Sequence, residues 1–121
     1  MSESKGRLRE GLSRWASHAR DEARDLQRDT EKAGCMCISD APDREMVVVQ
    51  GKLKTVTLRP RGGVPALEAE LYDGTGSVTV LWLGRRSIAG ISPGRSIRIK
   101  GRIGVHNDER IMYNPRYELR F

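Results

Sequence analysis

The sequence has no apolar run longer than four residues among its 121 positions. A helix that spans a membrane needs about twenty apolar residues in succession, so this pattern excludes a membrane-spanning helix. Residues 1–10 carry several charges and no apolar stretch follows them, which is the pattern of a chain without a secretory signal. We therefore expect a cytoplasmic protein without a membrane partner, whose thiols stay reduced.

Cysteine is also scarce, since Cys35 and Cys37 are the two cysteines of the chain. A structural zinc site takes four ligands, commonly cysteine and histidine at short, regular spacings. The two histidines, His18 and His106, do not share such a spacing with the cysteines. We therefore expect neither a metal site nor a cofactor, and we interpret the cysteines as unremarkable thiols of a linker.

Residues for catalysis are equally hard to find. The phosphate-binding pattern GxxxxGK(S/T) does not occur, and neither cysteine has a convincing base partner. Glu68 and Glu70 are the candidates for acid–base chemistry, but on a strand they point the same way into solvent, without a basic partner in sequence. His106 falls in a turn by composition and is more typical of a solvated residue than of a catalyst. We therefore expect no enzymatic activity.

Positive charge is distributed unevenly along the chain. Residues 1–45 contain nine Lys or Arg and ten Asp or Glu, a net charge of −1. Residues 46–121 contain thirteen basic and six acidic residues, a net charge of +7. Arginine outnumbers lysine by 17 to 5; a GC-rich coding sequence would produce this, and forked guanidinium groups also suit phosphates. The basic excess favours a polyanionic partner for the second part, nucleic acid above all.

The first part of the chain has the pattern of one amphipathic helix. Between residues 4 and 32 there is no proline, and apolar residues recur at spacings of three or four. They are Leu8, Leu12, Trp15, Ala19, Ala23 and Leu26. So narrow a stripe is marginal alone, so we expect the helix to dock on the folded domain, on a second copy or on a protein partner, with Trp15 as its largest anchor. Gly34 ends the helix, and Pro42 marks an irregular linker.

After the linker the apolar period changes from helical to two, which is typical of strands. We expect strands at 47–58, 66–72, 77–83, 96–105 and 110–120. In the second strand Leu67, Ala69 and Leu71 alternate with polar residues, so one side of that strand faces a core. The chain thus divides into an N-terminal helix with its linker, 1–44, and a folded β domain, 45–121.

The connections between the expected strands are short. The sequence Asp-Gly-Thr-Gly at 73–76 is typical of a tight hairpin in which a glycine takes a positive φ. SPGRS and HNDE are turns by composition, and 85–91 has the composition of one short helical turn. Gly51, inside the first strand, favours a strong bend or bulge. These elements predict a small closed Greek-key barrel, because closure leaves no bare sheet edge.

Three stretches of the second half resemble a known family. They read VVVQGKLKTVTLRPR, LEAELYDGTGSVTVLWLG and SPGRSIRIKGRIGV, and they span about residues 45–120. They resemble OB-fold nucleic-acid-binding domains of the anticodon-binding and helicase-wedge type, and are most similar to small bacterial OB-fold proteins with an N-terminal helix. The resemblance implies an all-β fold, a five-stranded Greek-key OB barrel with an N-terminal α-helix.

For OB folds that bind single strands, the resemblance implies a site on the outer face of the second and third strands. The loop after the first strand and the loop between the last two strands frame this site. Outward basic residues of the first and fourth strands, Arg98 among them, should merge into one stripe. The nucleic-acid-binding residues predicted in this way are Lys52, Lys54, Arg59, Arg61, Thr79, Leu81, Arg85, Arg86, Lys100, Arg102, His106, Arg110 and Tyr113.

Aromatic residues for stacking on bases are few. Trp82 is the natural candidate, but alternation from Val78 and Val80 places it inside, and we favour the core over an exposed position that a bulge would create. Tyr72 and Tyr113 are the next candidates, and each would equally serve as a rim residue at a barrel end.

The remaining residues of the predicted face favour recognition of the nucleic-acid backbone. Glu68 and Glu70 point outward and repel phosphate, while Thr79 and Leu81 offer poor stacking surfaces. We therefore predict a non-enzymatic module that binds nucleic acid, DNA in preference to RNA, single-stranded or structured, with low sequence specificity. The alternative is a protein-interaction module that uses the N-terminal helix and the basic face of the barrel.

Overall fold

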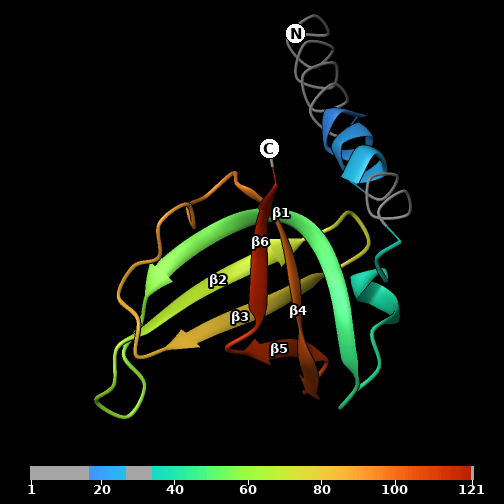
Figure 1. Ribbon diagram of the computed structural model, residues 1–121. Coiled ribbons are helices and arrows are strands. Elements are labelled where there is room, and N and C mark those ends of the chain that lie inside the picture. Colours follow the sequence, from blue (N-terminus) through green and yellow to red (C-terminus); the bar gives the residue numbers. More distant parts are fainter. Residues whose placement is uncertain (1–16, 27–33, 121) are drawn as a thin grey trace, which may run out of the picture.

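The computed structural model describes residues 17–26 and 34–120, and its strands form one sheet that curls into a barrel (Figure 1). A short 3-10 helix, η1 (Ile38–Asp40), precedes the barrel. The strands are β1 (Met46–Leu58), β2 (Ala66–Tyr72), β3 (Ser77–Leu83), β4 (Ser96–His106), β5 (Glu109–Tyr113) and β6 (Arg116–Arg120).

The barrel closes because β1 pairs with two different strands. Its first half, from Met46 to Lys52, pairs antiparallel with β4, and its second half, from Lys52 to Leu58, pairs antiparallel with β2. The order is β1-β2-β3-β5-β4, with β3 parallel to β5, and the β1–β4 pairing completes the circle. The five-stranded barrel with an N-terminal helix, predicted from the sequence, is confirmed.

The change of partner along β1 occurs next to Gly51. A side chain at this position would overlap the carbonyl oxygen of Tyr72, which lies against the glycine. The register between β1 and β2 also shifts between Leu53 and Thr55. Because a bulge increases the local twist and glycine admits a close backbone, the strand can turn across the barrel. The bend or bulge expected in the first strand is confirmed.

The core fills the inside of the barrel with alternate residues of every long strand. Leu67, Ala69 and Leu71 face inward, as their alternation predicts. Trp82 is also a core residue, 5% exposed, and its indole N–H donates to the carbonyl oxygen of Pro115 at 3.2 Å. The ring of Tyr117 meets it edge to face, with ring centroids 5.9 Å apart. Trp82 is therefore a packing residue, and the alternative of an exposed stacking platform is wrong.

Two connections differ from the sequence-based expectation. Residues 85–91 form an irregular loop with one turn at Ala89 and Gly90 rather than a helical turn, because Gly84 and Gly90 have positive φ while Ile88 and Ile91 anchor the loop in the core. The expected last strand, 110–120, is broken into β5 and β6. The break falls at Asn114, which has φ +48°, and at Pro115, which has no N–H to donate to a ladder.

The β2–β3 hairpin turn is held by the carboxylate of Asp73, which is fully buried. Its Oδ1 accepts from the N–H of Thr75 at 2.9 Å, from the Thr75 hydroxyl at 2.6 Å and from the N–H of Gly76 at 3.1 Å. Its Oδ2 accepts from the N–H of Ile38 at 2.8 Å. Gly74 has φ +91°, which confirms the expected positive-φ glycine in this turn.

The segments before β1 pack on the barrel. Ile38 of η1 and Ala41 are buried in the core, so part of the expected linker packs against the barrel. Residues 17–26 are helical, within the predicted helix, and the backbone of Ala23 lies against Gly74. Trp15 and its predicted docking lie outside the described residues. Neither described segment contains a helix long and apolar enough to cross a membrane. The division at residue 44 stays a prediction.

Candidate nucleic-acid interface

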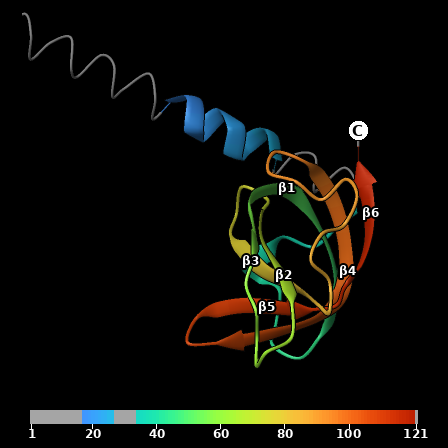
Figure 2. The same cartoon turned by 90° about the vertical axis from the view of Figure 1, so that its left-hand side faces the viewer.

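The outer face of the barrel between β2 and β4 is defined by strand register. Thr79 of β3 is paired with Ile111 of the adjacent β5, and Ile111 is paired with Gly104 of β4 on its other side. Two residues further along, Leu81 of β3 is paired with Tyr113 of β5. These side chains alternate with core residues, so they share the outward side. Figure 2 shows the β4–β5 hairpin extending beyond the other strands at the edge of this face.

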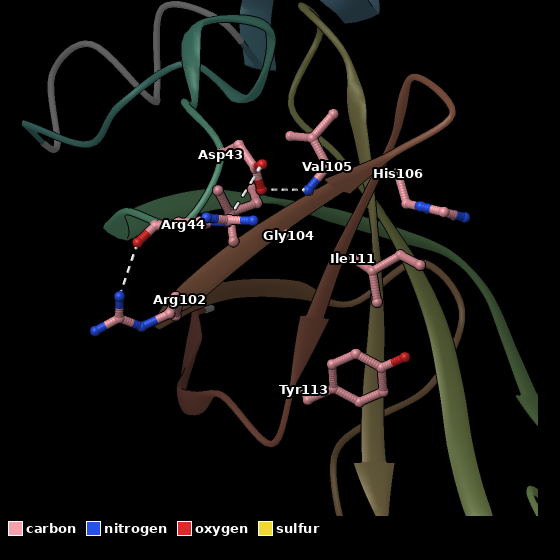
Figure 3. Close-up of a pocket in the computed structure, with 9 residues that line it drawn as sticks. Asp43, Arg44, Arg102, Gly104, Val105, His106, Ile111 and Tyr113 are labelled. Atoms are coloured by element: carbon pink, nitrogen blue, oxygen red, sulfur yellow. Dashed lines mark hydrogen bonds and ion pairs between the residues drawn. The ribbon is translucent and has the colours of Figure 1, made fainter.

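An open hollow of about 570 Å³ lies on this face, along β4 and β5. Arg102, His106 and Tyr113, all predicted from the sequence, line it together (Figure 3). The Tyr113 side chain is among the exposed large hydrophobic residues, at 56%. The lining of the hollow also includes Asp43, Arg44, Ile103, Gly104, Val105 and Ile111.

Short contacts hold the cations at the rim of this hollow. The Arg102 guanidinium donates to the carbonyl oxygen of Arg44 at 2.8 Å, and the N–H of Arg44 donates to the carbonyl oxygen of Ile103 at 2.8 Å. Asp43 accepts from the N–H of Val105 at 2.9 Å and lies 3.9 Å from the Arg44 guanidinium. The Arg44 side chain is 88% exposed, so this distant pair leaves its charge available to solvent.

Leu81 is the one predicted contact residue that the structure removes from the surface. Its register with Glu68 and Tyr113 places it on the outward side, as expected, but its exposure is 0%. Alternation predicts the side of the sheet, whereas exposure depends on neighbouring strands that the local pattern does not show. Leu81 therefore belongs to the floor beneath the face. Thr79 is half-buried on the same strand.

The β1–β2 loop carries less free charge than its sequence indicates. Glu68 of β2 lies 3.2 Å from the guanidinium of Arg59 and 3.0 Å from that of Arg61. Glu68 thus has basic partners in space that it lacks among its sequence neighbours, because strand pairing brings the loop back over β2. The N–H of Gly84 donates to the β1–β2 loop, which places Arg85 and Arg86 next to that loop. Both residues are exposed.

The cations of the predicted stripe on β1 and β4 differ in their neighbours, and their merging into one stripe stays a prediction. The Lys52 ammonium lies 3.9 Å from the Glu22 carboxylate of the helical segment. The Lys54 ammonium lies over the ring of Tyr72. Arg98 donates to Gln50 from two nitrogens, each at 3.2 Å. Lys100 and Arg102 are exposed on β4. The outward alternation on this strand is as predicted.

Arg110 has a different setting from the other predicted cations. Its guanidinium donates to the carbonyl oxygens of Ser39 at 2.9 Å and Ala41 at 3.2 Å. These bonds tie β5 to η1 and to the residue that follows it. Arg110 therefore stabilises the packing of that segment, and its contact with nucleic acid stays a prediction.

Sequence reasoning missed Arg44, Gly104 and Ile111 as site residues. The sequence places Arg44 at the end of the linker, whereas in the structure its positive φ, +68°, turns the chain into β1 beside β4. Gly104 faces Ile111 with no side chain of its own, which keeps the floor of the hollow low. The signal that could have found Ile111 is its alternation with Met112, which is a core residue.

Two features that suggest other chemistry do not form a site. Residues 90–94 read GISPG, a literal match to the nucleophile pattern GxSxG, but here the serine lies between turns rather than between a strand and a helix. In the described part of the chain, no three His, Cys, Asp or Glu side chains are grouped so that they could hold a metal ion. Cys35 and Cys37 are half-buried.

No protein-family model and no curated protein sequence matches this chain. Solved structures do match its fold. RecG, in a structure bound to a three-way DNA junction, has a TM-score of 0.60 and 19% identity over 70% of this chain. The p204 HINb domain has a TM-score of 0.59 and 15% identity over 75% of this chain. A replication protein A heterotrimer bound to ssDNA has a TM-score of 0.50 and 13% identity over 69%.

This chain spans 12% of the RecG chain, 49% of the p204 chain and 63% of the replication protein A chain. These neighbours are OB-fold proteins. At these identities the likeness is one of fold. The barrel is an OB fold, and the exposed hollow on its outer face is the candidate ligand site.

Proposed function

We propose that the protein is a non-enzymatic nucleic-acid-binding module that recognises single-stranded or structured DNA. Binding is mainly to the backbone, with low sequence specificity. The net charge of +7 on residues 46–121 supports a polyanionic ligand. The OB fold supports nucleic acid, because it places an open outer face between two loops.

One observation carries this proposal: an exposed Tyr113 ring shares a hollow with Arg44 and Arg102. A ring of this kind stacks on any base, a contact worth about 1–3 kcal/mol per base. The guanidinium groups provide charge-assisted hydrogen bonds to phosphate oxygens. A nucleotide carries both partners at fixed separation, so this combination suits a polynucleotide better than a free anion.

Low sequence specificity follows from the same residues. Reading a base requires side chains that donate and accept in a pattern matched to one base edge. The floor of the hollow offers Gly104 and Ile111, which have no polar side-chain atoms. Stacking and phosphate contacts use features that all nucleotides share.

Paired substitutions test this function. Tyr113→Ala should weaken binding of oligo-dT by about tenfold, since a lost stacking contact of about 1.4 kcal/mol corresponds to that factor. Tyr113→Phe keeps the ring and should bind like the parent. Arg102→Gln should weaken binding and lower its salt dependence, while Arg102→Lys should keep the salt dependence.

If Tyr113→Ala and Arg102→Gln both bind every nucleic acid like the parent, the proposed site is wrong. A parent protein that binds no nucleic acid would instead favour a protein-interaction module.

A further inference from the structure

The hollow beside Tyr113 is the first of three that follow one another along β4. A second, of about 550 Å³, shares Arg102 and Tyr113 with the first and adds Lys100 and Arg116. A third, of about 340 Å³, shares Lys100 and Arg116 with the second and extends to Arg98. Each hollow shares lining residues with the next, so the three follow one another along β4, and we name them together the β4 groove. At about 3.3 Å per residue, its course from His106 to Arg98 is about 26 Å long.

The middle of the β4 groove is built by the break between β5 and β6. Before the break β5 pairs with β4 around Ile103, and after it β6 pairs with β4 from Lys100 onward. The N–H of Asn114 donates to the carbonyl oxygen of Leu81 at 2.7 Å, and its Oδ1 accepts from the N–H of Leu83 at 2.8 Å. These bonds to β3, with the Trp82 bond to Pro115, hold the break in place.

Gly101 of β4 lies on the inner side of this break. A Cβ there would come within 2.8 Å of the Met112 sulfur and 3.3 Å of the Pro115 ring. The absence of a side chain therefore lets β5 and β6 cross close to β4. The break is a packed element of the barrel, so the groove over it has a defined shape.

Charge distinguishes the β4 groove from the face of β2 and β3. Five cations and two carboxylates line the groove, a net charge of +3. The cations are Arg44, Arg98, Lys100, Arg102 and Arg116. One carboxylate, Glu118, lies 3.2 Å from Arg120, which lies outside the lining. On the other face the guanidinium groups of Arg59 and Arg61 lie beside the Glu68 carboxylate, with the Glu70 carboxylate on the same strand.

We propose that the bound strand follows the β4 groove, leaving the Tyr113 hollow and crossing the β5–β6 break toward Lys100, Arg116 and Arg98. This inference rests on the proposed function and assigns its ligand as an extended single strand. Outward residues of β4 recur about 6.6 Å apart, from about 3.3 Å per residue, which is comparable with the separation of successive phosphates in an extended single strand. Phosphates would therefore meet successive cations of β4.

Two oligonucleotide lengths test this path. With successive phosphates about 6.6 Å apart, the groove of about 26 Å spans about five nucleotides, so oligo-dT of about 2 residues covers the Tyr113 hollow and oligo-dT of about 6 residues reaches the far end. The parent should bind the longer oligonucleotide at least tenfold more tightly. The double variant Lys100→Gln with Arg116→Gln should remove this gain and leave the shorter oligonucleotide unaffected. Its salt slope on the longer one should fall by about 1.4, or about 0.7 per lost phosphate contact.

Arg20→Gln with Arg24→Gln is the matched control, because it removes the same charge from exposed residues of the 17–26 helix. This control should retain the gain with length. If the groove variant and the control are indistinguishable while the parent binds both lengths, the path along β4 is wrong and the proposed function stands. An equal loss on a duplex of the same length would overturn the single-strand assignment. If the parent binds neither length, the proposed function itself fails.

Discussion

Asp73 in the β2–β3 turn accepts a hydrogen bond from the backbone N–H of Ile38, 35 residues earlier in the chain, at 2.8 Å. Both residues are fully buried. The same carboxylate organises its own turn through Thr75 and Gly76. One acidic side chain therefore closes the hairpin and fixes η1 to the end of the barrel.

Replacing Asp73 with Ala should lower the free energy of unfolding by about 3 kcal/mol, because it leaves buried N–H groups without an acceptor. Urea unfolding followed by circular dichroism measures this change. Asp40→Ala removes an exposed carboxylate of η1 and should change stability by less than about 0.5 kcal/mol. Equal stability of the two variants would show that the Asp73 bonds contribute nothing.

The two glycines of the hairpin turn should respond differently to a methyl group. Gly74 has φ +91°, and a Cβ there meets the backbone carbonyl of Ala23. Gly74→Ala should therefore cost more than about 1 kcal/mol. Gly76 lacks a positive φ, and its nearest contact would be ordinary, 3.5 Å from Ser39, so Gly76→Ala should cost less than half as much. Thermal melting compares them, and matching melting temperatures for both variants and the parent would contradict this account of the turn.

Trp82 should report the core rather than the ligand. In a Trp15→Phe background its emission should be blue-shifted, since the indole is 5% exposed. Saturating oligo-dT should leave this emission nearly unchanged. Trp82→Phe should cost about 1–2 kcal/mol through the lost bond to Pro115 and reduced packing. Strong quenching on addition of DNA would contradict the core assignment.

Glu68 should restrain the β1–β2 loop electrostatically. Glu68→Gln releases the guanidinium groups of Arg59 and Arg61. An exposed pair is worth up to about 1 kcal/mol, so affinity for DNA that touches this loop should rise by at most about fivefold. Glu70→Gln removes the same charge without releasing this pair and should have a smaller effect. If the two variants bind alike, the loop lies away from the DNA.

Local patterns were sufficient for β2 and β3. Their predicted bounds, 66–72 and 77–83, agree with the structure, because alternation and the turn between them are properties of adjacent residues. The break at Asn114 and Pro115 was missed because alternation continues on both sides of it. A proline within a strand was the signal against a continuous strand.

The candidate site was predicted less completely, because it depends on pairing between distant segments. Arg102, His106 and Tyr113 were predicted from alternation and the resemblance, and they line one hollow. The burial of Leu81 and the contact of Glu68 with the β1–β2 loop require the closed barrel. No pattern within a single strand contains that information.

The dependence of DNA binding on salt tests the central claim most directly. Affinities of the parent for single-stranded, duplex and forked DNA, and for single-stranded RNA, should be measured from low to physiological salt. With the cations of the β4 groove in contact with phosphates, single-stranded DNA should bind at low salt with a log–log slope of about −2 to −4, at about 0.7 per contact. Absence of binding to every nucleic acid at low salt, or an affinity that salt does not change, would contradict the account.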